Sequence, residues 1–251
     1  NYPGWVGPFY PPGTRPPEFL RIYSRAFKTV EIDSTFYGVP ADEAISAWAE
    51  RVPAGFAFAL KIPREITHER RLRNAGDELR AFVDRAYLLG DRLGPLLVQC
   101  PPDFGPQEEP SLAGFLAELP SGPRFAVEFR HGGWVTRETL ALLERHRVAL
   151  VLTDGPWVRK MLDLAIHPTT DFAYVRWAGR RRRQYSPADV DQQLSQWSVA
   201  LAALASRVKT VYGYFSNSFA GHAPESARAM QGLIGQKPVE ADQLGPQTSL
   251  F

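Results

Sequence analysis

The sequence has one cysteine, almost no excess charge and no long apolar run, and each shortage excludes a class of protein. A single cysteine, Cys100, among 251 residues excludes a disulfide framework and any metal site built from several cysteines. Lys and Arg number 29 against 27 Asp and Glu, so overall charge does not indicate a nucleic-acid-binding protein. No apolar stretch approaches the roughly 20 residues that span a bilayer. Since no signal-peptide pattern is found at Asn1 either, we expect a soluble, cytoplasmic protein.

What the sequence does contain is a regular alternation of short apolar runs and amphipathic stretches. Such alternation predicts a parallel sheet covered by helices. The runs expected to be buried strands are Thr29–Ser34, Phe56–Lys61, Pro95–Gln99, Phe125–Phe129, Val148–Leu152, Phe172–Trp177 and Thr210–Phe215. The stretches expected to be helices are Glu18–Phe27, Asp42–Arg51, Asp77–Leu89, Leu112–Leu119, Thr136–His146, Val158–Leu164, Pro187–Ser206 and Pro224–Leu233.

Seven strands are one fewer than a (β/α)₈ barrel contains. The chain begins on residues 1–17, whose prolines disfavour helix and sheet, and we expect an aromatic loop there. We therefore predict a TIM barrel whose first strand is missing from the N-terminus; either further residues precede Asn1 in the native protein, or the barrel closes another way. Residues 1–236 are expected to form this single domain, and the polar residues 237–251 a flexible C-terminal tail.

Polar side chains gather at one end of the predicted strands. In a parallel barrel the C-terminal strand ends open on one face, where active sites lie. The opposite ends carry little beyond Lys28, Arg124, Arg147 and Lys209. This asymmetry predicts a site at the C-terminal face. The polar residues at or just after these C-terminal ends are Glu31, Asp33, Lys61, His68, Gln99, Glu128, Arg130, His131, Asp154, Arg176, Tyr214 and Asn217.

The segment of residues 127–134 is the densest part of this pattern. Alternate side chains of a strand share a face, so Glu128 and Arg130 point the same way and His131 follows at the strand end. Burying such charges is costly unless they are paired or used. Two interpretations stay open: a chemical site, or a Glu–Arg pair that fixes register inside the barrel.

Short motifs occur in order along nearly the whole chain. They are residues 30–37; Lys61 with residues 66–68; Gln99 with Pro101; residues 127–131 with Trp134; Asp154; Tyr174 with Arg176; and residues 212–215 with Asn217, Gly221 and Ala223. Together they resemble the YecE-like family, also called domain of unknown function 72. The resemblance implies a TIM barrel but no particular reaction. This chain has Asp33 and Ser216 where the family favours Asn, Trp177 where it favours His, and no Gly-Thr-Ser-Gly opening strand before Asn1.

Arginines and aromatics favour a phosphate-bearing substrate. Arg176 and the run Arg180, Arg181, Arg182 and Arg183 occupy a region where TIM barrels commonly bind phosphate, and guanidinium forks match phosphate oxygens. The alternative is that the run is a solvated surface patch. The residues expected to bind substrate, including aromatics that can stack on bases, are Glu31, Asp33, Tyr37, Gln99, Arg130, Trp134, Arg176, Tyr185, Tyr214 and Asn217.

Acid–base groups are also present at the predicted face. The residues expected to be catalytic are Glu128, His131, Asp154, His68 and Lys61. Lys61 could form a Schiff base if desolvated, or pair with Glu31 or Glu128. A divalent metal stays open as a cofactor, because carboxylates and histidines drawn from separate strands leave no spacing signature.

The last five residues suggest a partner. Residues 247–251 resemble the Gln-Leu-Ser/Asp-Leu-Phe peptide by which bacterial DNA enzymes dock on the sliding clamp. The resemblance implies that Gln247, Leu250 and Phe251 contact the clamp, and the alternative is that Leu250 and Phe251 pack back on the barrel.

The leading hypothesis is therefore an enzyme that acts on a phosphate-bearing substrate, above all DNA or RNA in repair or processing, by nuclease-like hydrolysis. One alternative is a non-catalytic protein that binds nucleic acid or the clamp. The other is a small-molecule lyase or isomerase.

Overall fold

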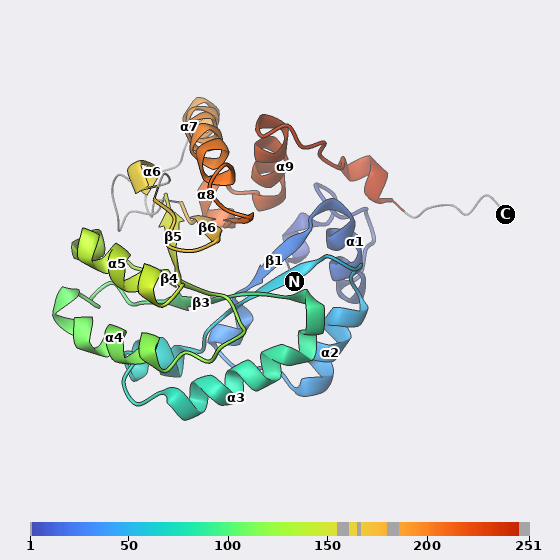
Figure 1. The fold of residues 1–251 in the computed structure, drawn as a ribbon. Coiled ribbons are helices and arrows are strands. Elements are labelled where there is room, and N and C mark those ends of the chain that lie inside the picture. Colours follow the sequence, from blue (N-terminus) through green and yellow to red (C-terminus); the bar gives the residue numbers. More distant parts are fainter. Residues whose placement is uncertain (1, 155–160, 165–166, 180–185, 246–251) are drawn as a thin grey trace.

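The computed structural model describes residues 2–154, 161–164, 167–179 and 186–245. Its centre is one sheet of seven parallel strands that are hydrogen-bonded in chain order, curved into a nearly closed barrel with helices around it (Figure 1). The prediction of a TIM barrel that lacks one strand is thereby confirmed. The strands are β1 (Thr29–Ile32), β2 (Ala57–Lys61), β3 (Leu93–Gln99), β4 (Phe125–Glu128), β5 (Ala149–Thr153), β6 (Phe172–Trp177) and β7 (Thr210–Phe215).

The helices follow the predicted stretches to within a few residues. They are α1 (Phe19–Ala26), α2 (Asp42–Glu50), α3 (Gly76–Ala86), α4 (Glu109–Ala117), α5 (Arg137–Arg145), α6 (Met161–Leu164), α7 (Pro187–Ala205), α8 (Asn217–Ala220) and α9 (Ala223–Leu233). Their starts have local causes: Ser186 accepts a hydrogen bond from the Asp189 amide and so caps α7. Short elements that the sequence does not predict include α8 and a π-helical turn, η4 (Glu65–Glu69).

Strand alternation sorts the side chains into an inner and an outer set. Phe58, Leu60 and Val98 point outwards and join the large core between sheet and helices. Inward-facing Ala59, Leu97, Ala126 and Val151 form a separate cluster with Phe172, Tyr174 and Tyr214 inside the barrel. The barrel interior is thus filled with apolar side chains up to a layer of charged ones at the C-terminal strand ends.

Between β7 and β1 the barrel is closed by side chains. The Thr29 hydroxyl and the Tyr214 hydroxyl are 2.8 Å apart, which joins the two strands inside the barrel. Outside, Trp5 donates a hydrogen bond to Asn217 at 3.2 Å, and its ring stacks on Tyr23 of α1. The aromatic loop expected over residues 1–17 therefore packs against this side of the barrel, where Phe9 is fully buried.

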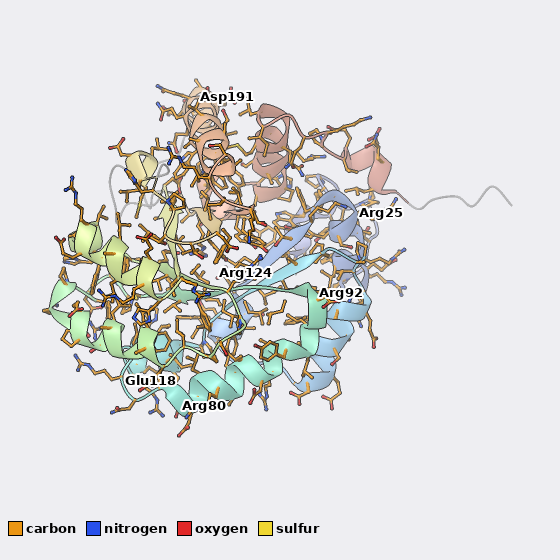
Figure 2. The ribbon with its side chains drawn as sticks, viewed as in Figure 1. Arg25, Arg80, Arg92, Glu118, Arg124 and Asp191 are labelled. Atoms are coloured by element: carbon orange, nitrogen blue, oxygen red, sulfur yellow. The ribbon has the colours of Figure 1, made fainter. Side chains whose placement is uncertain are left out.

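The segment after residue 236 departs from its prediction. Its turn η8 (Ala241–Leu244) lies beside α1, Leu244 is buried, and Arg25 donates hydrogen bonds to the carbonyls of Gln243, Leu244 and Gly245 (Figure 2). The sequence predicts a flexible tail from residue 237; in the structure an apolar side chain and a cationic partner place this stretch against the barrel as far as Gly245. Among the described residues, no helix combines the length and the apolar character that crossing a membrane requires.

Candidate functional site

Arg176 is the centre of the charged layer at the C-terminal end of the barrel. It leaves β6 inwards, and its guanidinium donates to Glu31 at 2.6 Å on one side and to Glu128 at 2.6 Å on the other. Tyr174, two residues earlier on the same face, donates its hydroxyl to the second oxygen of Glu31 at 2.6 Å. β1, β4 and β6 are thus connected across the barrel by a buried, charge-paired network.

Glu128 collects further donors from its neighbours. The Gln99 amide of β3 lies 3.0 Å from both carboxylate oxygens, and Arg130 donates through Nε at 3.3 Å. The Glu128 side chain is 1% exposed, whereas that of Arg130 is 25% exposed. Glu128 is therefore a buried anion, whereas its partner Arg130 is partly exposed to solvent. The Glu128–Arg130 ion pair is thus present, as both interpretations of the sequence allow.

Lys61 stands beside this network with a different environment. Its ammonium lies 3.9 Å from the centre of the Phe36 ring and 3.7 Å from Asp33, and its side chain is 10% exposed. The Asp33 side chain is 59% exposed and lies 3.6 Å from Arg176 as well. Lys61 thus pairs with a solvent-facing carboxylate, while the buried carboxylates are bound by Arg176.

The pKa values of the two buried glutamates, Glu31 and Glu128, are shifted in opposite directions. Burial raises the pKa of Glu31, the charge of Asp33 raises it further, and Arg176 and Tyr174 do not fully offset this. Burial also acts to raise the pKa of Glu128, but Arg176, Arg130 and Gln99 outweigh it and the pKa is lowered. Glu128 is therefore the permanent anion of the pair, and Glu31 the one closer to protonation.

The pKa values of Lys61 and His68 are both lowered, which favours their neutral forms. Burial lowers the pKa of Lys61, and the positive charge of Arg176 adds to the effect against the pull of Asp33. Burial lowers the pKa of His68 to about 4, and the charges of Lys61, Arg130 and Arg64 lower it in the same direction. His68 packs edge-on against Phe36, so it lies beside Lys61 as a neutral imidazole at pH 7.

Trp134, which the sequence predicts to bind substrate, lies in the core beside the charged layer. It is 2% exposed, stacks between Phe104 and Phe129, and donates its indole N–H to the Phe104 carbonyl at 2.7 Å. In the structure its ring fills the space between sheet and helices, and its polar atom has a partner inside the protein. Trp177, at the position where the family favours His, is 1% exposed and is likewise part of the core.

Tyr214 and Asn217, which the sequence predicts to bind substrate, make hydrogen bonds within the framework of the barrel. Tyr214 lies below the charged layer and bonds to Thr29. Asn217 accepts from the Trp5 indole and from the Ala223 amide at 3.0 Å, so it ties the N-terminal loop to the start of α9. Both side chains therefore form hydrogen bonds within the protein.

Asp154 and His131 accept hydrogen bonds from backbone amides of other residues. Asp154 accepts from the amides of Ala178 and Gly179, at 2.7 and 3.3 Å, and so shapes the turn after β6. His131 is exposed and accepts from the Gly133 amide at 3.1 Å, which caps the following turn. We therefore assign neither a catalytic role.

Several predicted site residues lie outside the described residues. They are Arg180, Arg181, Arg182, Arg183 and Tyr185, which follow β6 in the sequence, and Gln247, Leu250 and Phe251 of the C-terminal end. Within the described ranges, no three His, Cys, Asp or Glu side chains are grouped as ligands for an ion. Glu31, Asp33 and Glu128 instead form ion pairs with Arg176, and Asp154 and His131 accept hydrogen bonds from backbone amides.

Two contributors were missed as site residues in the sequence. Tyr174 appeared there in a motif but without a role, although its position two residues before Arg176 on the same face would have indicated it. Phe36 lies within the motif of residues 30–37, and in the structure its ring lies beneath the Lys61 ammonium.

The comparisons with known proteins fit this geometry. The profile of the family described as "Protein of unknown function DUF72" matches residues 1–249. The chain belongs to the DUF72 family. This DUF72 chain is 38% identical over 112 residues to the "UPF0759 protein YecE" of Escherichia coli K12, a match that covers 45% of the chain and 41% of that protein. It therefore spans less than half of that relative's length.

Two longer matches cover nearly the whole chain. The "UPF0759 protein YunF" of Bacillus subtilis is 25% identical over 96% of this chain and 95% of its own. A crystal structure of a DUF72 family protein from Thermotoga maritima is 26% identical, covers 94% of this chain and 96% of its own, and superposes with a TM-score of 0.79. The names of these relatives state no reaction, so the chemistry of this DUF72 barrel has to be inferred from its own residues.

Proposed function

We propose that the protein is an enzyme that binds a phosphate-bearing substrate at the charged mouth of the barrel. Lys61 and Arg130 contact the anionic group, and Lys61 supplies a proton to the leaving oxygen. The proposal is supported by the position of these cations at a strand-end face, where TIM barrels place their substrates.

One observation carries the proposal: Lys61 is nearly buried, yet its carboxylate partner is the exposed Asp33. Glu31 and Glu128 are bound by Arg176 inside the network. A phosphate oxygen that displaces Asp33 would therefore meet an ammonium already desolvated on the Phe36 ring, where electrostatic attraction is stronger than in water.

The acid–base role follows from the lowered pKa of Lys61. An ammonium with a pKa nearer to neutrality releases its proton more readily to a leaving alkoxide. Neutral His68 beside it has an imidazole suited to accept a hydrogen bond from an attacking water. Hydrolysis then breaks the bond between phosphorus and the leaving oxygen: the water's hydroxyl goes to phosphorus, the water's remaining proton goes to the His68 imidazole, and the Lys61 proton goes to the departing oxygen.

The nucleic-acid form of the proposal adds the arginines at 180–183, which directly follow the turn held by Asp154. A run of guanidinium groups beside a phosphate site suits a polyanion that extends beyond one phosphate. Sliding-clamp docking through Gln247, Leu250 and Phe251 is a separable proposal, and pull-down by the clamp before and after removal of these residues tests it.

The test is the salt dependence of binding to a single-stranded oligothymidylate, followed by fluorescence anisotropy. Lys61→Met is expected to weaken binding about tenfold and to reduce the slope of log affinity against log salt by about 1. Lys209→Met is the matched control, because Lys209 is 78% exposed at the opposite end of the barrel. Equal slopes for the two variants would contradict the phosphate contact.

A small-molecule lyase is the second candidate, favoured by the same lysine. A desolvated amine of lowered pKa can attack a carbonyl carbon, expel water and form an imine. Borohydride added in the presence of pyruvate would then reduce the imine to a stable amine on Lys61, detectable by peptide mass. No adduct, or an adduct that persists in Lys61→Arg, would count against this candidate.

A further inference from the structure

A second hollow lies next to the charged mouth and shares a wall with it. It is a cleft of about 570 Å³, a volume in the range of ligand sites, between the turn after β1 and the segment after β2. Phe36 is the shared wall, because its ring lies against Lys61 and His68 and also lines the cleft.

The cleft offers a planar ring a stacking partner and an apolar floor. Tyr37 on its rim is 81% exposed, the largest exposure among the exposed large hydrophobic side chains of the described residues. Its phenol is held edge-on by Phe36, with ring centres 5.1 Å apart. Ile66 and Phe82, both buried, form the floor. An exposed aromatic supported in this way is suited to stack on a flat ligand.

Cations connect the cleft to the mouth. Arg64 lines the cleft, and its charge, like those of Lys61 and Arg130, lowers the pKa of the intervening His68. Arg64 pairs with Glu69 at 3.6 Å, and both side chains are 60% exposed, so this pair opens to an incoming anion at little cost. A phosphate at Lys61 and a neighbouring one at Arg64 would lie on either side of the Phe36 wall.

The wall behind Arg64 has an unusual backbone. The π-helical turn η4 is followed by Arg71, Leu72 and Asn74, three non-glycine residues with positive φ of 53°, 65° and 49°. Such conformations cost free energy and concentrate at functional sites. Arg71 anchors the segment through ion pairs with Glu108 and Asp103. The cleft therefore has a rigid side.

We propose that this cleft is a base-binding subsite, in which Tyr37 stacks on the nucleobase next to the phosphate held at Lys61. The inference rests on the proposed function and names its substrate class: a nucleic-acid single strand in which at least one base is unstacked.

Two probes of equal length and charge separate the base from the phosphate. One is a single-stranded oligothymidylate, and the other is an abasic deoxyribose-phosphate oligomer. Tyr37→Ala is expected to weaken binding of the oligothymidylate by about 5-fold to 150-fold and to leave the abasic oligomer unchanged. Tyr37→Phe keeps the ring and should bind like the wild type. Tyr87→Ala, at a tyrosine 47% exposed on another face, is the control.

Thymidine, which lacks phosphate, probes the cleft alone. Chemical-shift changes that Tyr37→Ala abolishes and Lys61→Met preserves would support the subsite even if Lys61 proves not to bind phosphate. Equal affinity of Tyr37→Ala and wild type for the oligothymidylate, or equal losses for both oligomers, would overturn the base-binding subsite. Failure of Lys61→Met alone to alter binding would overturn the phosphate contact and leave the subsite standing.

Discussion

Arg176 shows how a single side chain organises the mouth. Three carboxylates, those of Glu31, Asp33 and Glu128, lie within 4 Å of its guanidinium. Burial acts to lower its pKa, but the carboxylates raise it well above the ordinary value, so the group stays charged. A buried charge network of this kind costs desolvation and returns stability only while all partners are present.

The dependence of the free energy of unfolding on pH tests the role of Glu128, the partner of Arg176 on β4. Because the pKa of Glu128 is lowered in the folded protein, its charge contributes stability above the unfolded value near 4.5 that is lost as pH falls through the folded pKa. Glu128→Gln should therefore cost about 3 kcal/mol at pH 7, and this deficit should shrink below pH 4.5. Urea denaturation at a series of pH values measures it.

Glu138→Gln is the matched control for that experiment. The pKa of Glu138 is also lowered, chiefly by a backbone hydrogen bond, but the side chain is exposed in the first turn of α5. Its loss at pH 7 should be far smaller. A Glu128→Gln deficit that stays constant down to pH 3 would show that its charge does not stabilise the fold.

At the scale of elements, two helices end in the same hydrogen-bonding pattern with different residues. After α9 the amides of Gly235 and Gln236 bond to the carbonyls of Gly232 and Gln231, and Gly235 has φ of 75°. After α5 the amides of Arg147 and Val148 bond in the same way to Glu144 and Leu143, but the left-handed position, with φ of 54°, is taken by Arg147.

Arg147→Gly should therefore stabilise the protein by about 0.5–1 kcal/mol, because glycine adopts positive φ without the steric cost of a side chain. Gly235→Ala should destabilise it by a similar amount. Thermal unfolding of both variants measures the pair. If Arg147→Gly is neutral while Gly235→Ala is not, a contact of the Arg147 side chain outweighs its backbone strain.

The elements also show how far the sequence could be interpreted. Period-two alternation correctly placed Glu31, Glu128 and Arg176 inside one barrel end, because strand geometry alone decides which face a side chain takes. It could not tell that Trp134 would turn outwards after β4 and find the Phe104 carbonyl. That outcome depends on packing between segments 30 residues apart, which local pattern does not encode.

The cleft beside Tyr37 was beyond prediction for a related reason. Tyr37 was expected to bind substrate, but its partners Ile66 and Phe82 come from a π-helical turn and from α3. The π-helical turn follows Pro63, and in the sequence Ile66 is a single large apolar residue among polar and charged ones, a pattern that predicts no buried face. The hollow exists because tertiary packing fixes that turn against Phe36.

At the scale of the whole molecule, the join between β7 and β1 differs from the rest of the barrel. In the part of the chain that the structure describes, the hydrogen-bonded order begins at β1 and ends at β7, with no ladder between them. The Thr29–Tyr214 pair and the Trp5–Asn217 bond connect the two sides there. Strand edges held by side chains open more easily than edges held by a backbone ladder.

Amide hydrogen exchange should reveal this difference. Peptides covering β1 and β7 are expected to exchange faster than those covering β3 and β4, which have ladder partners on both sides. Trp5→Ala should speed exchange in β1 and β7 further and leave β3 and β4 unchanged, because the indole stacks on Tyr23 and bonds to Asn217. Uniform acceleration across all strands would mean that the N-terminal loop stabilises the barrel as a unit. Since Glu31 of β1 binds Arg176 of β6, opening at this join would also disturb the charged mouth, and ligand binding at the mouth should slow exchange in β1.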